Sequence, residues 1–189
     1  MHDIVIPNNN ETEFIALAKR LGIKKLTFAY TAKRPISSDQ TDITIEHAIL
    51  AETNQISKTK QAKLLTISIA SREAIERGAD IVYGFEQQPT KDHTHFRSSG
   101  LNQVLCKLAQ QNNTKIAFLL SNILAVTGPQ QAILLGRIMQ NIAFCTKYKT
   151  KMKIATFATN PMQLRAPQEL TALFITLGMQ ESEIREAID

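Results

Sequence analysis

DIVIPNNN, residues 3–10, is the stretch that decides between two classes of α/β fold. Residues 3–6 have the β-branched, apolar character of a short strand. An open dinucleotide-binding sheet would place a glycine-rich phosphate loop directly after such a strand, but Pro7 and three asparagines follow it here. The stretch therefore favours a closed or nearly closed (β/α) barrel over an open doubly wound sheet.

Downstream of this stretch, short β-branched runs alternate with helical periodicity, which is typical of parallel β/α units. Strands are expected at residues 3–6, 24–30, 43–51, 64–69, 79–83, 115–119 and 153–157. Helices are expected at 11–21, 72–77, 101–112 and 129–147 and from the last strand to the end, with polar loops at 31–40 and 54–63. We therefore predict a single α/β domain, residues 1–189, with about seven parallel strands in a TIM-barrel-like fold. Some crossovers must be short, because an eight-unit barrel usually needs about 200 residues or more.

Size and composition exclude several other classes of protein. A chain of 189 residues with 43% apolar content is long enough to bury one core. Its longest apolar run, 116–126, is interrupted by Ser121 and Asn122 and is too short to span a bilayer. The amino terminus has no basic segment followed by a long apolar stretch, and Cys106 and Cys145 lack CxxC spacing. We therefore expect a cytoplasmic protein with reduced thiols and no membrane partner.

The positive charge of the chain is concentrated in one segment. Residues 91–165 contain ten basic residues and one acidic residue, Asp92, although the net charge of the whole chain is only +5. The basic residues are Lys91, Arg97, Lys107, Lys115, Arg137, Lys147, Lys149, Lys151, Lys153 and Arg165. Because solubility alone does not explain the missing acids, a polyanion is the expected partner of this segment.

KDHTHFRSSG, residues 91–100, follows the fifth predicted strand and allows two kinds of site. A metal site would use the His-x-His pair formed by His93 and His95. Further ligands are scarce at the predicted strand ends, where only Glu52 and Glu86 are available nearby, and the surrounding positive charge opposes a cation. A metal-dependent phosphoesterase that uses His93, His95, Glu86 and Asp3 is the alternative hypothesis.

A phosphate site is better supported by the local sequence. Ser98 or Ser99 is expected to cap the helix that follows, which leaves free backbone N–H groups beside Arg97. A guanidinium, two hydroxyls and the positive end of a helix would then converge on an anion. Capping alone is the competing role for the serines, and an internal ion pair is the competing role for Arg97. A similar arrangement is expected at Arg165, just before the next predicted helix.

Four lysines alternate with other residues at 147–153. If this run is extended, Lys147, Lys149, Lys151 and Lys153 lie on one side, about 6 to 7 Å apart, which roughly matches a nucleic-acid backbone. The run enters the seventh predicted strand, whereas the segments with Arg97 and Arg165 leave strands, so a barrel would place them at opposite ends. Few aromatic residues could stack on bases, and most of them are expected to pack in the core or at its rim: Tyr30, Tyr83, Phe85, Phe96 and Tyr148.

Three stretches of the sequence resemble one known family. They are YGFEQQPTKDHTHFRSSGLNQVLCKLA (83–109), LGRIMQNIAFCTKYKTKMKIATFATNPMQLRAPQEL (135–170) and DIVIPNN (3–9). The chain resembles archaeal ribonuclease P protein component 3, a relative of the thirty-kilodalton subunit of the eukaryotic enzyme. The resemblance implies a barrel related to the PHP phosphoesterase fold. PHP enzymes carry an early His-x-His metal motif, whereas the opening here supplies only His2 and Asp3, so no catalytic site and no cofactor are expected in this chain.

The resemblance also implies an accessory role in removing the 5′ leader of precursor tRNA. In this family the RNA subunit performs the hydrolysis with magnesium, and the protein binds that RNA together with a small partner protein subunit. Precursor tRNA would then be a partner only indirectly. The RNA contacts carried over from the family motifs are Arg97 in RSSG, Lys147 in CTKYK and Arg165 in LRAP. Charge and position alone add Lys91, His95, Ser98, Ser99, Arg137 and Lys149.

Overall fold

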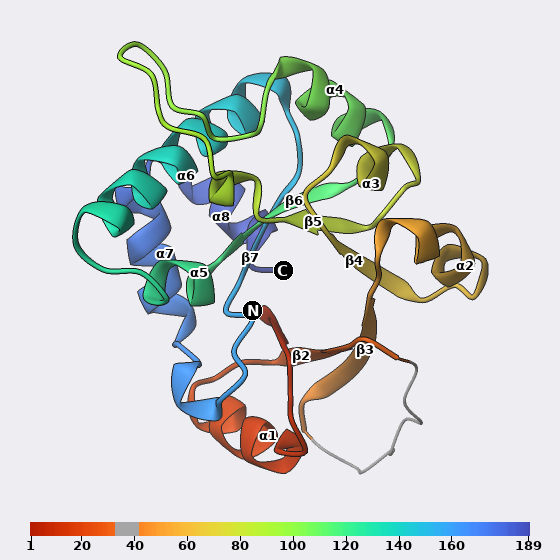
Figure 1. The fold of residues 1–189 in the computed structure, drawn as a ribbon. Helices are drawn as coiled ribbons and strands as arrows, with labels where there is room; N and C mark the ends of the chain where they lie inside the picture. Colours follow the sequence, from red (N-terminus) through yellow and green to blue (C-terminus); the bar gives the residue numbers. More distant parts are fainter. Residues whose placement is uncertain (33–41) are drawn as a thin grey trace.

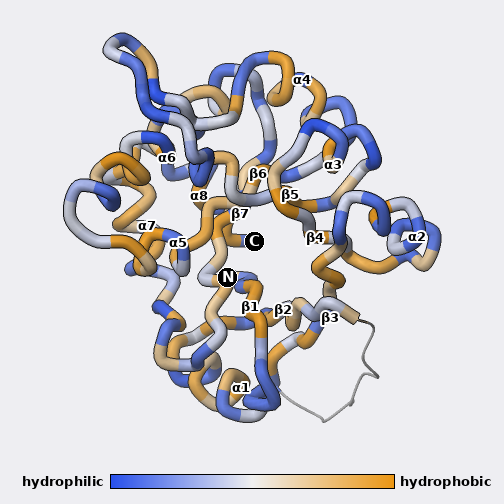
Figure 2. The backbone as a smooth tube through the Cα atoms, viewed as in Figure 1, coloured by the Kyte–Doolittle hydropathy of each residue, from blue (hydrophilic) through white to orange (hydrophobic). Residues whose placement is uncertain are grey.

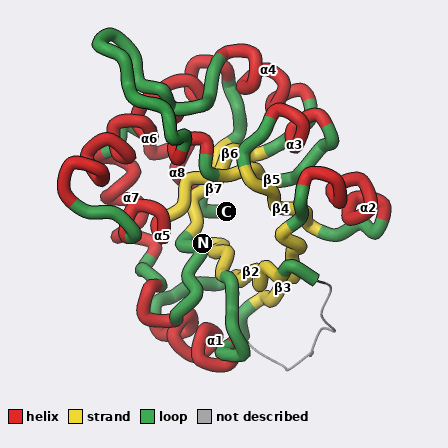
Figure 3. Tube along the Cα trace, viewed as in Figure 1, coloured by secondary structure: helices red, strands yellow, loops and turns green. Residues whose placement is uncertain are grey.

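The protein is a parallel β-barrel surrounded by helices (Figures 1 and 3). The computed structural model describes residues 1–32 and 42–189. Within these residues, seven strands form one parallel sheet in the order of the sequence. The strands are β1 His2–Val5, β2 Lys25–Tyr30, β3 Thr44–Leu50, β4 Leu65–Ile69, β5 Ile81–Tyr83, β6 Lys115–Leu119 and β7 Met152–Ala155.

The barrel closes where β1 meets the end of β7. The Phe157 N–H donates to the Ile4 carbonyl and the Ile6 N–H donates to the Ala158 carbonyl, both at 2.9 Å. The buried Asp3 carboxylate reinforces this seam, since it accepts hydrogen bonds from the backbone N–H groups of Ile4 and Thr156 and from the Thr156 hydroxyl. The predicted TIM-barrel-like fold is therefore confirmed.

Helices cover the outside of the barrel, as Figure 3 shows in red around the strands. They are α1 Glu11–Arg20, α2 Ile56–Gln61, α3 Arg72–Glu76, α4 Gln103–Gln111, α5 Leu120–Leu124, α6 Gly128–Tyr148, α7 Pro167–Thr176 and α8 Glu181–Ala187. Three short 3₁₀ turns accompany them in the described residues: η1 Thr53–Gln55, η2 Phe85–Gln87 and η3 Pro161–Gln163. None of the helices among residues 1–32 and 42–189 combines the length and apolar character needed to cross a membrane.

One sequence prediction about these connections is wrong, and one short helix was not predicted. The stretch at 54–63 was expected to be a polar loop, but η1 and α2 occupy most of it. Ile56 is fully buried and anchors a short helix whose other residues are mostly exposed. The helix α5 follows β6 directly. Its five residues are too few to show a helical periodicity in the sequence. The loop predicted at 31–40 lies almost entirely outside the described residues.

The interior of the barrel is apolar along most of its length and polar at the end where the strands begin. Small and β-branched residues such as Ile4, Ala29, Ile67, Ala117 and Ala155 form one buried cluster. Figure 2 shows the strands largely in orange and the outer turns of the helices largely in blue.

His2, Thr27 and Lys153 occupy the polar end of the interior, because alternation puts each of them on the same strand face as a member of that cluster. The His2 ring lies 2.6 Å from the Thr27 hydroxyl and the Lys153 ammonium donates to the His2 carbonyl at 2.8 Å. Burial lowers the pKa of His2 to about 3 and that of Lys153 to about 8.

Candidate nucleic-acid interface

The segment between β5 and α4, residues 84–102, folds against α6 and projects beyond it (yellow-green at the upper left of Figure 1). We call it the β5–α4 segment. Arg137 of α6 holds its first half: the guanidinium donates to the Asp92 carboxylate at 2.8 Å and to the carbonyls of Glu86, Gln88 and Thr90. Only 6% of Arg137 is exposed. The prediction that Arg137 contacts RNA is therefore wrong, because its N–H groups bind the protein's own chain.

Gln140 and Asn141, one turn further along α6, hold the second half of the segment. The Gln140 side-chain amide accepts from the Arg97 N–H at 3.0 Å and donates to the Arg97 carbonyl and the Ser99 hydroxyl at 2.8 Å each. Asn141 donates to the Ser99 carbonyl at 3.4 Å. Consecutive turns of one helix thus fasten the segment at several points.

The predicted anion cradle at the start of α4 does not form. Asn102 is the residue that caps α4, since its side-chain oxygen accepts from the Leu105 N–H at 3.0 Å. The Ser98 hydroxyl donates to the Lys91 carbonyl and Ser99 is 1% exposed, so both serines stabilise the segment internally. The expected capping role of Ser98 or Ser99 is wrong because the helix begins at Gln103, four residues after Ser99, and Asn102 holds the N-cap position.

Arg97 combines an internal ion pair with an exposed surface. Its guanidinium lies 3.5 Å from the Asp92 carboxylate, yet 47% of the side chain is exposed. It rests directly on α6 at Gly136, where a Cβ atom would lie 2.3 Å from the Arg97 Cζ. Burial acts to raise the pKa of Asp92, but the hydrogen bonds from Ser98 and Arg137 outweigh it and hold that pKa below its usual value. Arg97 therefore forms the internal ion pair that was considered as its competing role, and about half of its side chain still reaches solvent.

The tip of the β5–α4 segment carries Lys91, His93, His95 and Phe96, all of them exposed. The His93 N–H donates to the Phe96 carbonyl at 2.9 Å, which closes a tight turn. The two rings stack with their centroids 4.4 Å apart and an angle of 22° between their planes. The tip therefore presents a paired aromatic surface next to cationic side chains.

The four residues of the alternative metal hypothesis do not converge. Asp3 is used at the barrel seam, Glu86 is 1% exposed beside Asn122, and His93 stacks on Phe96. In the described part of the chain, no group of three or more His, Cys, Asp or Glu side chains is placed to hold a metal ion. Burial raises the pKa of both Asp3 and Glu86, which reflects their enclosed positions.

The lysines of 147–153 do not form the predicted extended stripe. Lys147 lies in the last turn of α6, Lys149 ends that helix in a left-handed conformation, and Lys153 is 1% exposed inside the barrel. The stripe prediction is wrong because helical backbone continues to Tyr148 and the strand begins only at Met152. Lys147 and Lys149 remain exposed at the end of the barrel opposite the β5–α4 segment.

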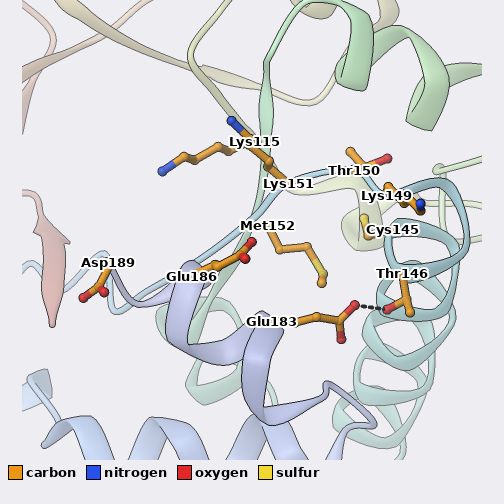
Figure 4. A pocket seen from close by; sticks show the side chains of 10 residues that line it. All are labelled: Lys115, Cys145, Thr146, Lys149, Thr150, Lys151, Met152, Glu183, Glu186 and Asp189. Atoms are coloured by element: carbon orange, nitrogen blue, oxygen red, sulfur yellow. Dashed lines mark hydrogen bonds between the residues drawn. The ribbon is translucent and has the colours of Figure 1, made fainter.

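A cavity of about 690 Å³ lies beside these lysines. Figure 4 shows Lys115 and Lys151 on one side of it and Glu183 and Glu186 on the other. Glu183 accepts a hydrogen bond from the Thr146 hydroxyl at 2.6 Å. Because its lining carries both signs of charge, the cavity itself is a poor phosphate site, and Lys147, which is exposed outside the lining, is better placed for a polyanion.

Arg165 does not form the second anion site that was expected at the start of α7. Its guanidinium donates to the carbonyls of Met162 and Leu164 at 3.0 and 2.8 Å. The Glu169 carboxylate accepts from the Ala166 N–H at 2.8 Å and so places a negative charge at the helix start. Arg165 as a whole is half-buried.

A family model described as RNase P subunit p30 matches residues 90–189, which is more than half of the chain. The chain belongs to the RNase P subunit p30 family. Two relatives named Ribonuclease P protein component 3 are similar to it. The protein from Methanosarcina barkeri is 28% identical over 204 residues, covering 100% of this chain and 83% of the relative. The protein from Methanosarcina acetivorans is 37% identical over 92 residues, covering 49% of this chain and 38% of the relative.

A solved chain supports the fold assigned to this p30-family protein. It belongs to a cryo-EM structure of archaeal ribonuclease P with mature tRNA and gives a TM-score of 0.77 at 22% identity. The likeness covers 97% of this chain and 87% of the solved chain. At this level of identity it shows that the barrel is shared.

Sequence reasoning missed three residues that organise the site in this p30-family chain. Asn102 could have been found, because asparagine is a preferred N-cap residue and it stands directly before the helical periodicity. Gly136 and Gln140 gave no signal, since their roles depend on the docking of a segment about forty residues earlier in the chain.

Proposed function

We propose that this chain is a protein subunit of ribonuclease P that binds the RNA subunit and supports removal of the 5′ leader from precursor tRNA. The observation that carries the proposal is the family match over residues 90–189, which covers the whole of the acid-poor basic segment. Because this segment has ten basic residues and a single acid, its exposed cations are suited to neutralise RNA phosphates.

The proposed RNA contacts are the cations whose charged groups reach solvent. Lys91 and Arg97 are exposed on the β5–α4 segment, Lys147 and Lys149 are exposed at the end of α6, and Arg165 is half-buried after η3. His95 belongs to the same exposed tip as Lys91. The hydrogen bonds of three less exposed residues stabilise the β5–α4 segment internally: Ser98, Ser99 and Arg137. Because the two groups of cations lie at opposite ends of the barrel, a large folded RNA would have to wrap around the molecule, or a partner protein would cover one of the groups.

We assign no catalytic residue and no cofactor to this chain. Hydrolysis belongs to the RNA subunit with its magnesium ions, and precursor tRNA is reached through that RNA. A small partner protein subunit completes the proposed assembly. We propose that this assembly is located in the cytoplasm. The chain's own part is to hold the RNA by its phosphates, a contact that depends on shape rather than base sequence.

The proposal is tested by reconstituting precursor tRNA cleavage from the RNA subunit and its proteins with and without this chain. We expect cleavage at limiting magnesium to fall when the chain is omitted. Replacing Arg97 by alanine should lower cleavage and reduce the slope of log affinity against log salt by about 0.7 to 0.9, the value for one lost phosphate contact. Arg72→Ala, at an exposed arginine of α3 outside the basic segment, is the matched control.

Cleavage that is indifferent to the presence of this chain would refute the proposal. Hydrolysis of a phosphate ester by the purified chain with manganese, abolished by His95→Ala, would instead support the phosphoesterase hypothesis. An unchanged salt slope for Arg97→Ala with intact subunit function would refute the assignment of Arg97 alone.

A further inference from the structure

Phe96 is a large aromatic side chain left exposed in a polar stretch. Its residue exposure is 58%, and it is the only large apolar residue between Pro89 and Arg97. Figure 2 colours the projecting segment mostly in blue and pale shades, as expected for a stretch of largely hydrophilic residues. A ring in this position does not contribute to the core of the protein, and its isolation from other apolar side chains distinguishes it from the clustered anchors of a protein-binding surface.

The Phe96 ring is held in place before any ligand arrives. One face stacks on His93 at 4.4 Å, and the turn between them is closed by the hydrogen bond from the His93 N–H to the Phe96 carbonyl. Directly after the ring, Gln140 binds both the N–H and the carbonyl of Arg97. Because the backbone on both sides of Phe96 is fixed, little ordering entropy remains to be lost on binding.

The exposed side chains around the ring are positively charged, and the buried Arg137 below them is paired with Asp92. Asp92 is the one acid of the segment from Lys91 to Arg165, and its carboxylate faces Arg137 and the Ser98 N–H. Lys91 and Arg97 flank the tip with exposed cationic groups. A flat apolar ring between two cations complements a nucleotide, which joins a flat base to phosphates on either side.

We propose that Phe96, supported by His93, stacks on an unpaired RNA base while Lys91 and Arg97 contact the adjoining phosphates. This inference rests on the proposed function, because the base belongs to the RNA that the subunit binds. It adds a contact with the base itself to the phosphate contacts already assigned. The ligand is a single-stranded nucleotide in a loop, bulge or end, since a base inside a helix is stacked on its neighbours.

The absence of tryptophan from the chain allows a direct test. Phe96→Trp places a single indole at the tip and preserves an aromatic surface, so its fluorescence should be quenched when the ribonuclease P RNA is added. Ile175→Trp, at an exposed position near the end of α7, is the matched control and should show no comparable quenching. Phe96→Ala should weaken RNA binding by about 5- to 150-fold, the range for loss of one stacked base.

The salt dependence separates stacking from phosphate binding. Phe96→Ala should leave the slope of log affinity against log salt unchanged, whereas Lys91→Ala should reduce it by about 0.7 to 0.9. Phe96→Tyr should restore most of the affinity that Phe96→Ala loses. Because the ring is exposed, the thermal unfolding of all three variants should match that of the parent.

Each outcome decides between the inference and the function on which it rests. If the parent binds the RNA and Phe96→Ala binds equally well, the stacking inference fails and the subunit role stands. If the parent does not bind the RNA, both fail. If Phe96→Ala binds RNA normally but lowers cleavage only when the other protein subunits are present, the ring contacts a protein and the stacking inference is overturned.

Discussion

At the scale of single residues, the contact between Arg97 and Gly136 shows how a helix can position a functional cation. A guanidinium can lie flat on α6 only where the helix lacks a side chain, and Gly136 provides that place. Glycine inside a helix is ordinarily unfavourable by roughly 0.5 to 1 kcal/mol relative to alanine. Its presence in the middle of α6 is explained by the space that Arg97 occupies.

Gly136→Ala should separate stability from RNA binding. The new Cβ would lie 2.3 Å from the Arg97 Cζ, so the flexible guanidinium must move away while the helix gains up to about 1 kcal/mol. We expect unchanged or increased stability in denaturant titrations, together with RNA affinity as low as that of Arg97→Ala. In the double variant Gly136→Ala, Arg97→Ala, the loss should equal that of Arg97→Ala alone. Additive losses would show that Gly136 acts independently of Arg97.

At the scale of elements, α6 is the support on which the β5–α4 segment is built. Arg137 donates to the carbonyls of Glu86, Gln88 and Thr90 and to the carboxylate of Asp92. Gln140 and Asn141 bind the second half of the segment. The segment has no regular structure of its own beyond η2 at its start. Its shape is therefore determined by side chains of a helix that comes later in the sequence.

Arg137→Lys should test this supporting role, because lysine keeps the charge but cannot direct a planar set of N–H groups at several acceptors. We expect the free energy of unfolding to fall by about 1 to 3 kcal/mol, as buried carbonyls lose their donors. Limited proteolysis should then cut within residues 86–99, where the parent resists. Arg72→Lys, at an exposed ion pair of α3, is the control and should change neither measurement. An Arg137→Lys variant with parental stability and parental resistance to proteolysis would show that Arg137 does not hold the β5–α4 segment in place.

At the scale of the whole molecule, the closed barrel encloses ionisable groups that a single sheet would leave in water. His2 and Lys153 lie at its polar end, and Asp3 joins the first strand to the last. Burial lowers the pKa of His2 from 6.5 to about 3, so the folded protein resists a proton that the unfolded chain accepts. Below pH 6.5 the unfolded chain gains a proton at His2 and the folded protein does not. The contribution of His2 to the free energy of unfolding is therefore fully present above pH 6.5 and declines as the pH falls toward 3.

His2→Gln should remove this part of the pH dependence, because glutamine can still bind Thr27 but does not titrate. Between pH 6.5 and 4.5 the parent should lose about 2 kcal/mol more of unfolding free energy than the variant. Denaturant titrations at both pH values give the comparison, and His95→Gln, at an exposed histidine, is the control. Parallel curves for the parent and His2→Gln would show that the buried ring does not govern acid stability.

Much of the fold could be predicted because the signals that specify it are local. The runs at 115–119 and 25–30 alternate or cluster apolar residues in a way that defines strands without reference to the rest of the chain. The helix expected at 129–147 was found as α6, since proline in its first turn and a long periodic pattern mark its limits. Residues 120–124 could not be predicted, because five residues carry less than two helical turns of pattern.

By itself, the sequence determined the barrel, the family and the basic segment from 91 to 165. The periodicity of strands, the residues of a sequence motif and the sign of each charge can all be read from neighbouring residues. Only the tertiary structure decided which of those charges reach solvent. Arg137 and Asp92 are 45 positions apart, and their pairing buries one cation and leaves Arg97 beside it half-exposed. Whether a side chain meets water or a distant partner depends on how the chain folds back on itself, which no local pattern encodes.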